Sequence, residues 1–389
     1  AAMAEVMAPK HYPEESYFKA YGTWADGGWG MIMTGNVEVS AKYNGSPTNV
    51  IVPSQLPLEK QETARQAWKT WAATTQRSGT PAVVQLVHPG RQSPLASGKK
   101  SIFEKNVAPS PVPLNLGSSF IACAASAVMF GTPRELTTEE ISGKGGIIEQ
   151  FIEGGREAYK AGFKGAELHA ATDEFGGSAA KRAEILVRII KGTRAVTGDD
   201  FQIGVKLNSA DVSAAGSVSQ ALEQIKLLAD AGVDFIEISG GTYESPTMML
   251  GREQPEKKES TKRREAFFLD FAQEVRTRFP SLPLLVTGGF RTRSGMEAAL
   301  QSGVCDMIGI ARPAAILPKL PKEIILNTKE VSDEKANLEV PLIGVPFPMN
   351  LLPIKSLGGG AESLYYAKQI QTFAKGGVPK DTRLIVQVK

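Results

Sequence analysis

Short apolar runs rich in Val, Ile and Leu alternate along the chain with amphipathic stretches. This alternation is typical of βαβ units that build a parallel sheet. The apolar runs predict eight strands, the first of them only a tail: Ala1–Met3, Met31–Gly35, Ala82–Leu86, Gly165–His169, Gln202–Leu207, Phe235–Ser239, Leu284–Gly288 and Met307–Ile310. The stretches between them predict helices over Glu14–Ala25, Leu58–Gln76, Thr138–Ala161, Ser178–Val196, Val218–Ala231, Arg263–Phe279 and Ser294–Gln301.

Eight strands that alternate with helices predict an α/β fold of the (β/α)8 TIM barrel type. A doubly wound sheet would carry a G-x-G-x-x-G turn after its first strand, and none is present. Residues 92–134 follow the third strand, are rich in Pro, Ser and Gly, and predict a loop excursion over the barrel top. A helical period returns only at Glu362–Ala374. We therefore expect one domain, with a barrel body at 1–330 and a C-terminal cap at 331–389.

The start of the chain is abrupt. An apolar stretch, AAMAEVM, is already under way at Ala1, and the expected first strand is entered near its end. We expect the true N-terminus to lie upstream.

Charge and composition narrow the function classes. Lys and Arg number 44 against 41 Asp and Glu, and this near-neutral balance argues against a nucleic-acid partner. Two cysteines, Cys123 and Cys305, rule out a disulfide scaffold and favour a reducing, cytoplasmic location. The most apolar run, Phe120–Phe130, is too short to cross a membrane. Three histidines without ligand spacing argue against a metal site, and the sequence has no G-x-S-x-G element of a serine hydrolase.

The active site of a TIM barrel lies at the carboxyl ends of its strands, so polar residues there are informative. No carboxylate pair dominates among them. Gly288 and Gly289 follow the seventh strand, and Gly309 and Ala311–Arg312 follow the eighth. Small residues let backbone N–H groups approach a phosphate, and Arg312 can add a charged contact. The alternative is that these glycines only turn a tight corner.

Two further residues are candidates for the ring of a phosphate-bearing cofactor. The Gln85 amide can pair with a pyrimidine-like edge, and Lys206 can stabilise negative charge that develops on it. The alternatives are a polar Gln85 bonded to neighbouring backbone and a salt bridge from Lys206 to Glu237. For His88, at the end of the third strand, a structural hydrogen bond is favoured over a cofactor contact.

An ordered series of motifs covers nearly the whole chain: AAMAE, WADGGWGMIMTGNVEV, VVQLVHPGRQSP, FGTPRELTTEEI, IGVKLNSAD, DFIEISGGTYE, TGGFRTRSGM and MIGIARP. This series resembles the old yellow enzyme family, in particular its NADH:flavin oxidoreductase branch. The resemblance implies a TIM barrel that carries FMN and takes NAD(P)H as reductant. It further implies a set of flavin contacts: backbone of Ala2, Met3 and Gly35, the pyrimidine edge on Gln85, Lys206 beside N1 and O2, and the phosphate on Gly288, Gly289, Ala311 and Arg312.

The chain departs from the family pattern after the fourth strand, where it reads GAELHAATDEFGGSAAKRAEI. His169 keeps the first ligand of the substrate carbonyl, but Thr172 falls where the second His or Asn would stand. The tyrosine that protonates the substrate has no counterpart. The resemblance thus implies an ene-reductase for a small α,β-unsaturated carbonyl, slowed by a shortened loop. The alternative is a redox-silent homologue that acts as an isomerase, a cyclase or a small-molecule-binding protein. The sequence carries no signal for the oligomeric state.

Overall fold

The computed structural model describes residues 1–101, 103–169, 179–208, 217–239, 270–338, 340, 345, 351 and 357–381. Several predicted features fall outside these residues. They are the segment after His169 with Thr172, the first part of the helix predicted at Arg263–Phe279, and much of the expected C-terminal cap.

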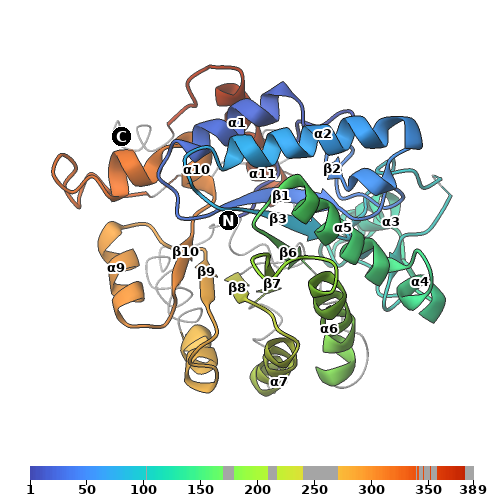
Figure 1. The fold of residues 1–389 in the computed structure, drawn as a ribbon. Coiled ribbons are helices and arrows are strands. Elements are labelled where there is room, and N and C mark those ends of the chain that lie inside the picture. The colour runs from blue at the N-terminus through green and yellow to red at the C-terminus, as the bar shows by residue number, and fades with distance from the viewer. Residues whose placement is uncertain are drawn as a thin grey trace.

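One curled parallel sheet organises the chain (Figure 1). Its order is β10-β9-β8-β7-β6-β3-β1-β2, and every neighbouring pair is parallel. The strands are β1 (Ile32–Glu38), β2 (Val50–Ile51), β3 (Ala82–Val87), β6 (Gly165–His169), β7 (Gln202–Asn208), β8 (Phe235–Ser239), β9 (Leu284–Thr287) and β10 (Met307–Gly309). The prediction of an α/β fold with a parallel sheet is confirmed.

Seven of the predicted strands form within two or three residues of their expected bounds, and the first does not. Residues 1–8 have no regular secondary structure. Instead, the amino group of Ala1 donates to the Ile310 carbonyl at 3.2 Å, directly after β10. The N-terminal segment therefore lies beside the end of β10. It does not join the sheet, because it makes this one polar contact with β10 and not a ladder of backbone hydrogen bonds. The eighth strand of the sheet is β2, which the sequence pattern did not predict.

Helices surround the outside of the curled sheet (Figure 1). They include α1 (Glu15–Ala25), α2 (Leu58–Thr75), α5 (Ile147–Ala161), α6 (Ala179–Arg194), α7 (Ser217–Asp230) and α9 (Arg293–Gln301). The single helix predicted over Thr138–Ala161 is wrong, since α4 (Thr138–Ser142) and α5 are separate. Gly143–Gly146 separates them, and Gly145 has a φ of 74°, which a helix does not allow.

The segment 92–134 has secondary structure of its own. It contains α3 (Phe120–Met129) and a strand β4 (Val107–Ala108), which pairs in parallel with β5 (Arg134–Glu135) to form a second small sheet. Two buried side chains tie the segment together. Lys100 Nζ donates to the Asn106 Oδ1 at 2.5 Å, and Asn106 Nδ2 donates to the carbonyls of Ser93 at 2.7 Å and Phe130 at 2.8 Å.

The last described helix, α11 (Leu357–Ala374), begins five residues before the predicted start at Glu362. It packs against α1 at the start of the chain and against α10 (Arg312–Ile316). Two tryptophans strengthen this junction: Trp24 Nε1 donates to the Ala314 carbonyl at 2.9 Å, and Trp29 Nε1 donates to the Pro318 carbonyl at 2.8 Å. The helices thus join the two ends of the chain on the outside of the sheet.

The apolar core lies mainly between the sheet and its helices. Trp68 and Trp71 of α2 are fully buried there, and Cys305 is buried as well. No helix of the described part of the chain is long and apolar enough to span a membrane.

Candidate functional site

The concave side of the sheet has an apolar layer at the amino ends of its strands. Met33, Val83, Phe235 and Leu285 form a buried cluster there, and Ala2, Met31 and Met307 pack against it. Gly204 of β7 makes room for this layer, because a Cβ at that position would lie 2.1 Å from the Phe235 ring. The side chains fill this end of the sheet and leave ligand binding to the other end.

A polar layer lies one step further along the strands. Gln85, Glu167, Lys206 and Glu237 stand on β3, β6, β7 and β8, and each is flanked on its strand by apolar residues that pack outward. Gln85 is the register partner of Glu167, and Lys206 is the register partner of Glu237. Because strand residues alternate between faces, the four side chains share the concave side.

Each member of this layer has a specific partner. Gln85 Nε2 donates to Glu167 Oε2 at 2.5 Å, and Lys206 Nζ donates to Glu237 Oε1 at 2.8 Å. The backbone N–H of Gln85 donates to Thr34 Oγ1 at 3.0 Å. Lys206 therefore makes the salt bridge that sequence analysis named as its alternative role, and the Gln85 amide bonds a carboxyl rather than backbone.

The two carboxyls of the layer differ in their protonation. Burial raises the pKa of Glu167 well above its ordinary value, and the neighbouring Glu237 raises it further. Burial acts in the same direction on Glu237, but the Lys206 ammonium and a hydrogen bond with Glu167 outweigh it and lower the pKa of Glu237. The sequence pattern did not predict this carboxyl pair. The signal was present in β6, where Glu167 interrupts an otherwise apolar strand.

His169 ends β6 at the rim above the polar layer. Burial lowers its pKa to about 3, with a further contribution from the Lys206 charge, so the imidazole is neutral near pH 7. Its Nδ1 is buried and has no hydrogen-bond partner among the residues that the structure describes. A neutral imidazole with a free ring nitrogen can donate one hydrogen bond to a ligand above the layer.

Gly288–Gly289 follow β9 and Gly309 ends β10. These two glycine corners lie side by side on the same rim. Gly309 of β10 is the register partner of Thr287 of β9, which places the segments after both strands next to each other. Gly288 and Gly289 have φ values of 113° and 83°, a backbone region that favours glycine. A Cβ at Gly309 would lie 1.9 Å from Thr287 Oγ1, so this position also requires glycine. Thr287 Oγ1 is buried without a partner in the described part of the chain.

Ala311 and Arg312 follow β10 as expected, and Arg312 opens α10. Its Nη1 lies 3.1 Å from Oε1 of Glu362 on α11. This ion pair joins the start of α10, directly after β10, to α11. The sequence pattern did not predict a role for Glu362, because the ion pair joins residues on two helices that are 50 positions apart in the chain.

Gly35 of β1 contacts the N-terminal segment. Its N–H donates to Glu5 Oε1 at 3.0 Å, and the Tyr21 hydroxyl bonds both groups. A Cβ at Gly35 would lie 2.3 Å from the Met3 carbonyl. Only glycine therefore allows Met3 to pass this close to the strand.

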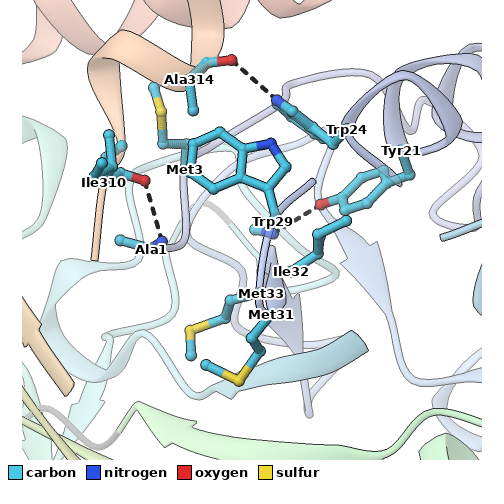
Figure 2. Close-up of a pocket in the computed structure, with 12 residues that line it drawn as sticks. Ala1, Met3, Tyr21, Trp24, Trp29, Met31, Ile32, Met33, Ile310 and Ala314 are labelled. Carbon is cyan, nitrogen blue, oxygen red and sulfur yellow. Dashed lines mark hydrogen bonds between the residues drawn. The ribbon is translucent and has the colours of Figure 1, made fainter. Parts of the chain in front are cut away.

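Two cavities adjoin these elements. The one between the N-terminal segment and β1 measures about 40 Å³, which is far too small for a flavin (Figure 2). The second measures about 560 Å³ and lies beyond the ends of β1 and β3, where Ser40, Tyr43, His88 and Gln150 line it. His88 Nδ1 accepts from the Gly90 N–H at 3.2 Å, in agreement with the structural role that we favoured.

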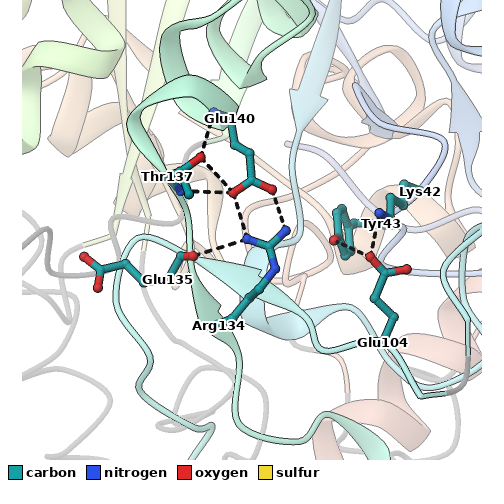
Figure 3. A network of polar contacts seen from close by, with 7 residues as sticks. All are labelled: Lys42, Tyr43, Glu104, Arg134, Glu135, Thr137 and Glu140. Atoms are coloured by element: carbon teal, nitrogen blue, oxygen red, sulfur yellow. Dashed lines mark hydrogen bonds and ion pairs between the residues drawn. The ribbon is translucent and has the colours of Figure 1, made fainter.

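A polar network fixes one wall of the larger cavity (Figure 3). The Arg134 guanidinium pairs with both carboxylate oxygens of Glu140, at 2.7 and 2.5 Å, and Thr137 closes a capping box with the same carboxylate. Lys42 pairs with Glu104 at 2.5 Å on the opposite side. The Arg134 contacts attach the end of the segment 92–134 to the start of α4, and the Lys42–Glu104 pair attaches the segment to the loop after β1.

Comparison with known proteins places these features in a family. The model of the NADH:flavin oxidoreductase / NADH oxidase family matches residues 2–330. An NADH-dependent flavin oxidoreductase of Talaromyces variabilis, iccE, is 40% identical over 394 residues, which cover 97% of this chain and 94% of that protein. A second such enzyme, iliE of Hypocrea jecorina, is 41% identical over 374 residues and 92% of each chain.

Solved structures share the fold at lower identity. The old yellow enzyme homologue of Zymomonas mobilis superposes with a TM-score of 0.64 at 21% identity, over 87% of this chain and 91% of that one. A 2-naphthoyl-CoA reductase complex gives a TM-score of 0.71 at 20% identity, over 95% of this chain and 55% of that one.

Proposed function

Since the chain belongs to the NADH:flavin oxidoreductase / NADH oxidase family and is thus a flavin-dependent oxidoreductase with FMN and NAD(P)H, we propose that it reduces the C=C bond of an α,β-unsaturated carbonyl or a related small electrophile. Its relatives are named as NADH-dependent, and we extend that preference for NADH to this chain. We also propose that the curled sheet is part of a TIM barrel, whose first-strand position residues 1–3 occupy, with 331–389 as a cap.

One observation carries the proposal: buried polar groups without partners point to the rim where the strands end. His169 Nδ1 and Thr287 Oγ1 lack hydrogen bonds in the described chain, although burial makes an unpaired polar atom costly. The two atoms flank the polar layer from β6 and β9. A bound molecule with acceptors and donors along its length would satisfy both.

The residues present fit FMN. Gln85 and Lys206 offer an amide and a cation for a pyrimidine edge, and the glycine corners at Gly288–Gly289 with Arg312 suit a phosphate. When bound, FMN supplies hydride transfer between NAD(P)H and the second substrate. Lys206 would hold its ammonium beside the ring edge that gains negative charge.

The neutral His169 would bind and polarise the substrate. Its N–H donates to the carbonyl oxygen and stabilises the negative charge that develops there during reduction of the conjugated C=C bond. The proton on the neighbouring carbon then comes from water or from a group outside the described residues, because no tyrosine stands at the family position. We therefore expect low turnover.

The absorbance spectrum of purified protein tests the proposal. We expect a yellow protein whose flavin band bleaches under anaerobic NADH and returns when an enone is added. Protein that bleaches but is reoxidised only by oxygen would contradict the enone assignment. Colourless protein that FMN cannot reconstitute would support the redox-silent alternative.

A further inference from the structure

The proposed function gives no part to the carboxyl pair below the rim. Glu167 and Glu237 are both fully buried, and each binds one of the two side chains that we assign to the flavin ring. Glu167 Oε2 accepts from Gln85, and Glu237 Oε1 accepts from Lys206. The inference that follows rests on that assignment of Gln85 and Lys206.

The other two carboxyl oxygens of the pair lack a hydrogen-bond donor. Glu167 Oε1 and Glu237 Oε2 are buried, and while both carboxyls are ionised they receive no hydrogen bond from the described residues. The two carboxyl groups nevertheless lie within hydrogen-bonding reach of each other. Two adjacent acceptors without a donor repel, and the cost is high in a buried site.

The number of protons on the two carboxyls decides whether these oxygens are satisfied. Without a proton, two orphaned acceptors and an excess negative charge remain. With two protons, Lys206 loses its counter-ion, which is strongly unfavourable for a buried ammonium. One proton on Glu167, donated to Glu237, satisfies both oxygens and leaves one carboxylate opposite one ammonium.

We propose that Glu167 and Glu237 hold a single shared proton and act as positioning residues, which orient the Gln85 amide and set the net charge that Lys206 presents to the flavin. The chain of donors then runs from Gln85 to Glu167 to Glu237, and from Lys206 to Glu237. Lys206 keeps two N–H groups for the ring, and its charge there is partly neutralised. Such a site lowers the flavin reduction potential relative to one with an uncompensated lysine.

The two glutamates should respond differently to amidation. Gln resembles a protonated Glu. Glu167→Gln should therefore change neither the FMN affinity nor the equilibrium between oxidised and two-electron-reduced flavin by more than threefold. Glu237→Gln removes the ionised carboxylate and should favour the two-electron-reduced flavin about tenfold, which is roughly 30 mV for a two-electron couple. Sulfite affinity for the oxidised flavin should rise in parallel.

Glu157→Gln is the matched control. Glu157 is buried and pairs with Arg65 at 2.9 Å, but it lies between α2 and α5 on the outside of the sheet. We expect this variant to lose stability without any shift in potential. If Glu237→Gln fails to fold, Glu237→Asp serves instead, with a smaller shift of the same sign.

Infrared difference spectra give a direct measurement of the proton. We expect a carboxylic-acid C=O band that moves in D2O and disappears in Glu167→Gln. Equal potential shifts in Glu167→Gln and Glu237→Gln, or no loss of the acid band, would overturn the shared proton. Neither result touches the proposed function, which fails only if FMN does not bind or the enone is not reduced.

Discussion

The N–H of Gly35, in the middle of β1, donates to the buried carboxylate of Glu5 at 3.0 Å. The contact fixes the N-terminal segment against the strand. Burial raises the pKa of Glu5 to about 7, although the hydrogen bonds from Tyr21 and Gly35 act to lower it. A titratable group at this position makes stability depend on pH.

We predict that Glu5→Gln abolishes part of this dependence. Because its pKa is raised, Glu5 keeps its proton up to about pH 7 in the folded chain. In the unfolded chain the same carboxyl releases its proton above about pH 4.5, its ordinary pKa. Stability from this group is therefore complete below about 4.5 and is lost as the pH rises to about 7, by about 3 kcal/mol. Glu5→Gln should flatten the stability curve in this window and exceed the wild type above it.

Urea unfolding between pH 4 and pH 8 measures the effect. Glu38→Gln provides an independent comparison, because burial also raises the pKa of Glu38 to about 7 and its partners, Asn49 and Gly45, are separate from those of Glu5. The two changes should add. A Glu5→Gln profile parallel to that of the wild type would show that Glu5 is ionised throughout.

His169→Ala should lower enone reduction by roughly 10² to 10³ in kcat. The variant loses the only N–H that we assign to the substrate carbonyl, while the residues assigned to FMN are unchanged. Stopped-flow absorbance separates the two half-reactions. Reduction by NADH should stay within a few-fold of the wild type, and reoxidation by the enone should slow. An equal loss in both steps would place His169 in cofactor binding instead.

Gly309→Ala should destabilise the protein by roughly 1 to 3 kcal/mol and lower its FMN content. The new methyl group would lie 1.9 Å from Thr287 Oγ1, so β9 and β10 must separate. Thermal unfolding and flavin absorbance report the two effects. Gly30→Ala is the control, since no atom lies within 4 Å of its Cβ position, and Thr287→Ala should partly rescue Gly309→Ala. A neutral Gly309→Ala would contradict the close packing of these corners.

Asn106→Ala should loosen the segment 92–134 without unfolding the sheet. The substitution removes the donors to the Ser93 and Phe130 carbonyls and the acceptor for Lys100. We expect a local loss of at least about 2 kcal/mol, because buried partners are left unsatisfied. Hydrogen exchange within 92–134 should accelerate, while β6 to β8 stay protected. The exposed Lys105→Ala should change neither.

Sequence predicted the strands well where burial on both faces produced short, mainly apolar runs, as in β6 and β8, whose predicted bounds agree with the structure to the residue. It failed where an element depends on a distant partner. Ala1–Met3 has a strand composition, but its amino group bonds Ile310 and no ladder forms. The helix over Thr138–Ala161 failed for a local reason, since Gly143–Gly146 contains its own stop signal.

The same distinction holds for the candidate site. The glycine corners were readable because β9 and β10 are consecutive strands of a parallel sheet. The Lys206–Glu237 pair was one of two readings, and only register decided that the side chains meet. The carboxyl pair was not anticipated, because Glu167 and Glu237 stand on strands with β7 between them.

The tryptophan contacts at the junction of the two chain ends have a consequence for biosynthesis. Trp24 and Trp29 bond carbonyls that follow them by 290 and 289 residues. At about 5 to 20 residues per second, a ribosome needs roughly 15 to 60 seconds to deliver those partners. During that interval α1 and β1 have one flank uncovered, so α1 is synthesised long before it can reach its final surroundings.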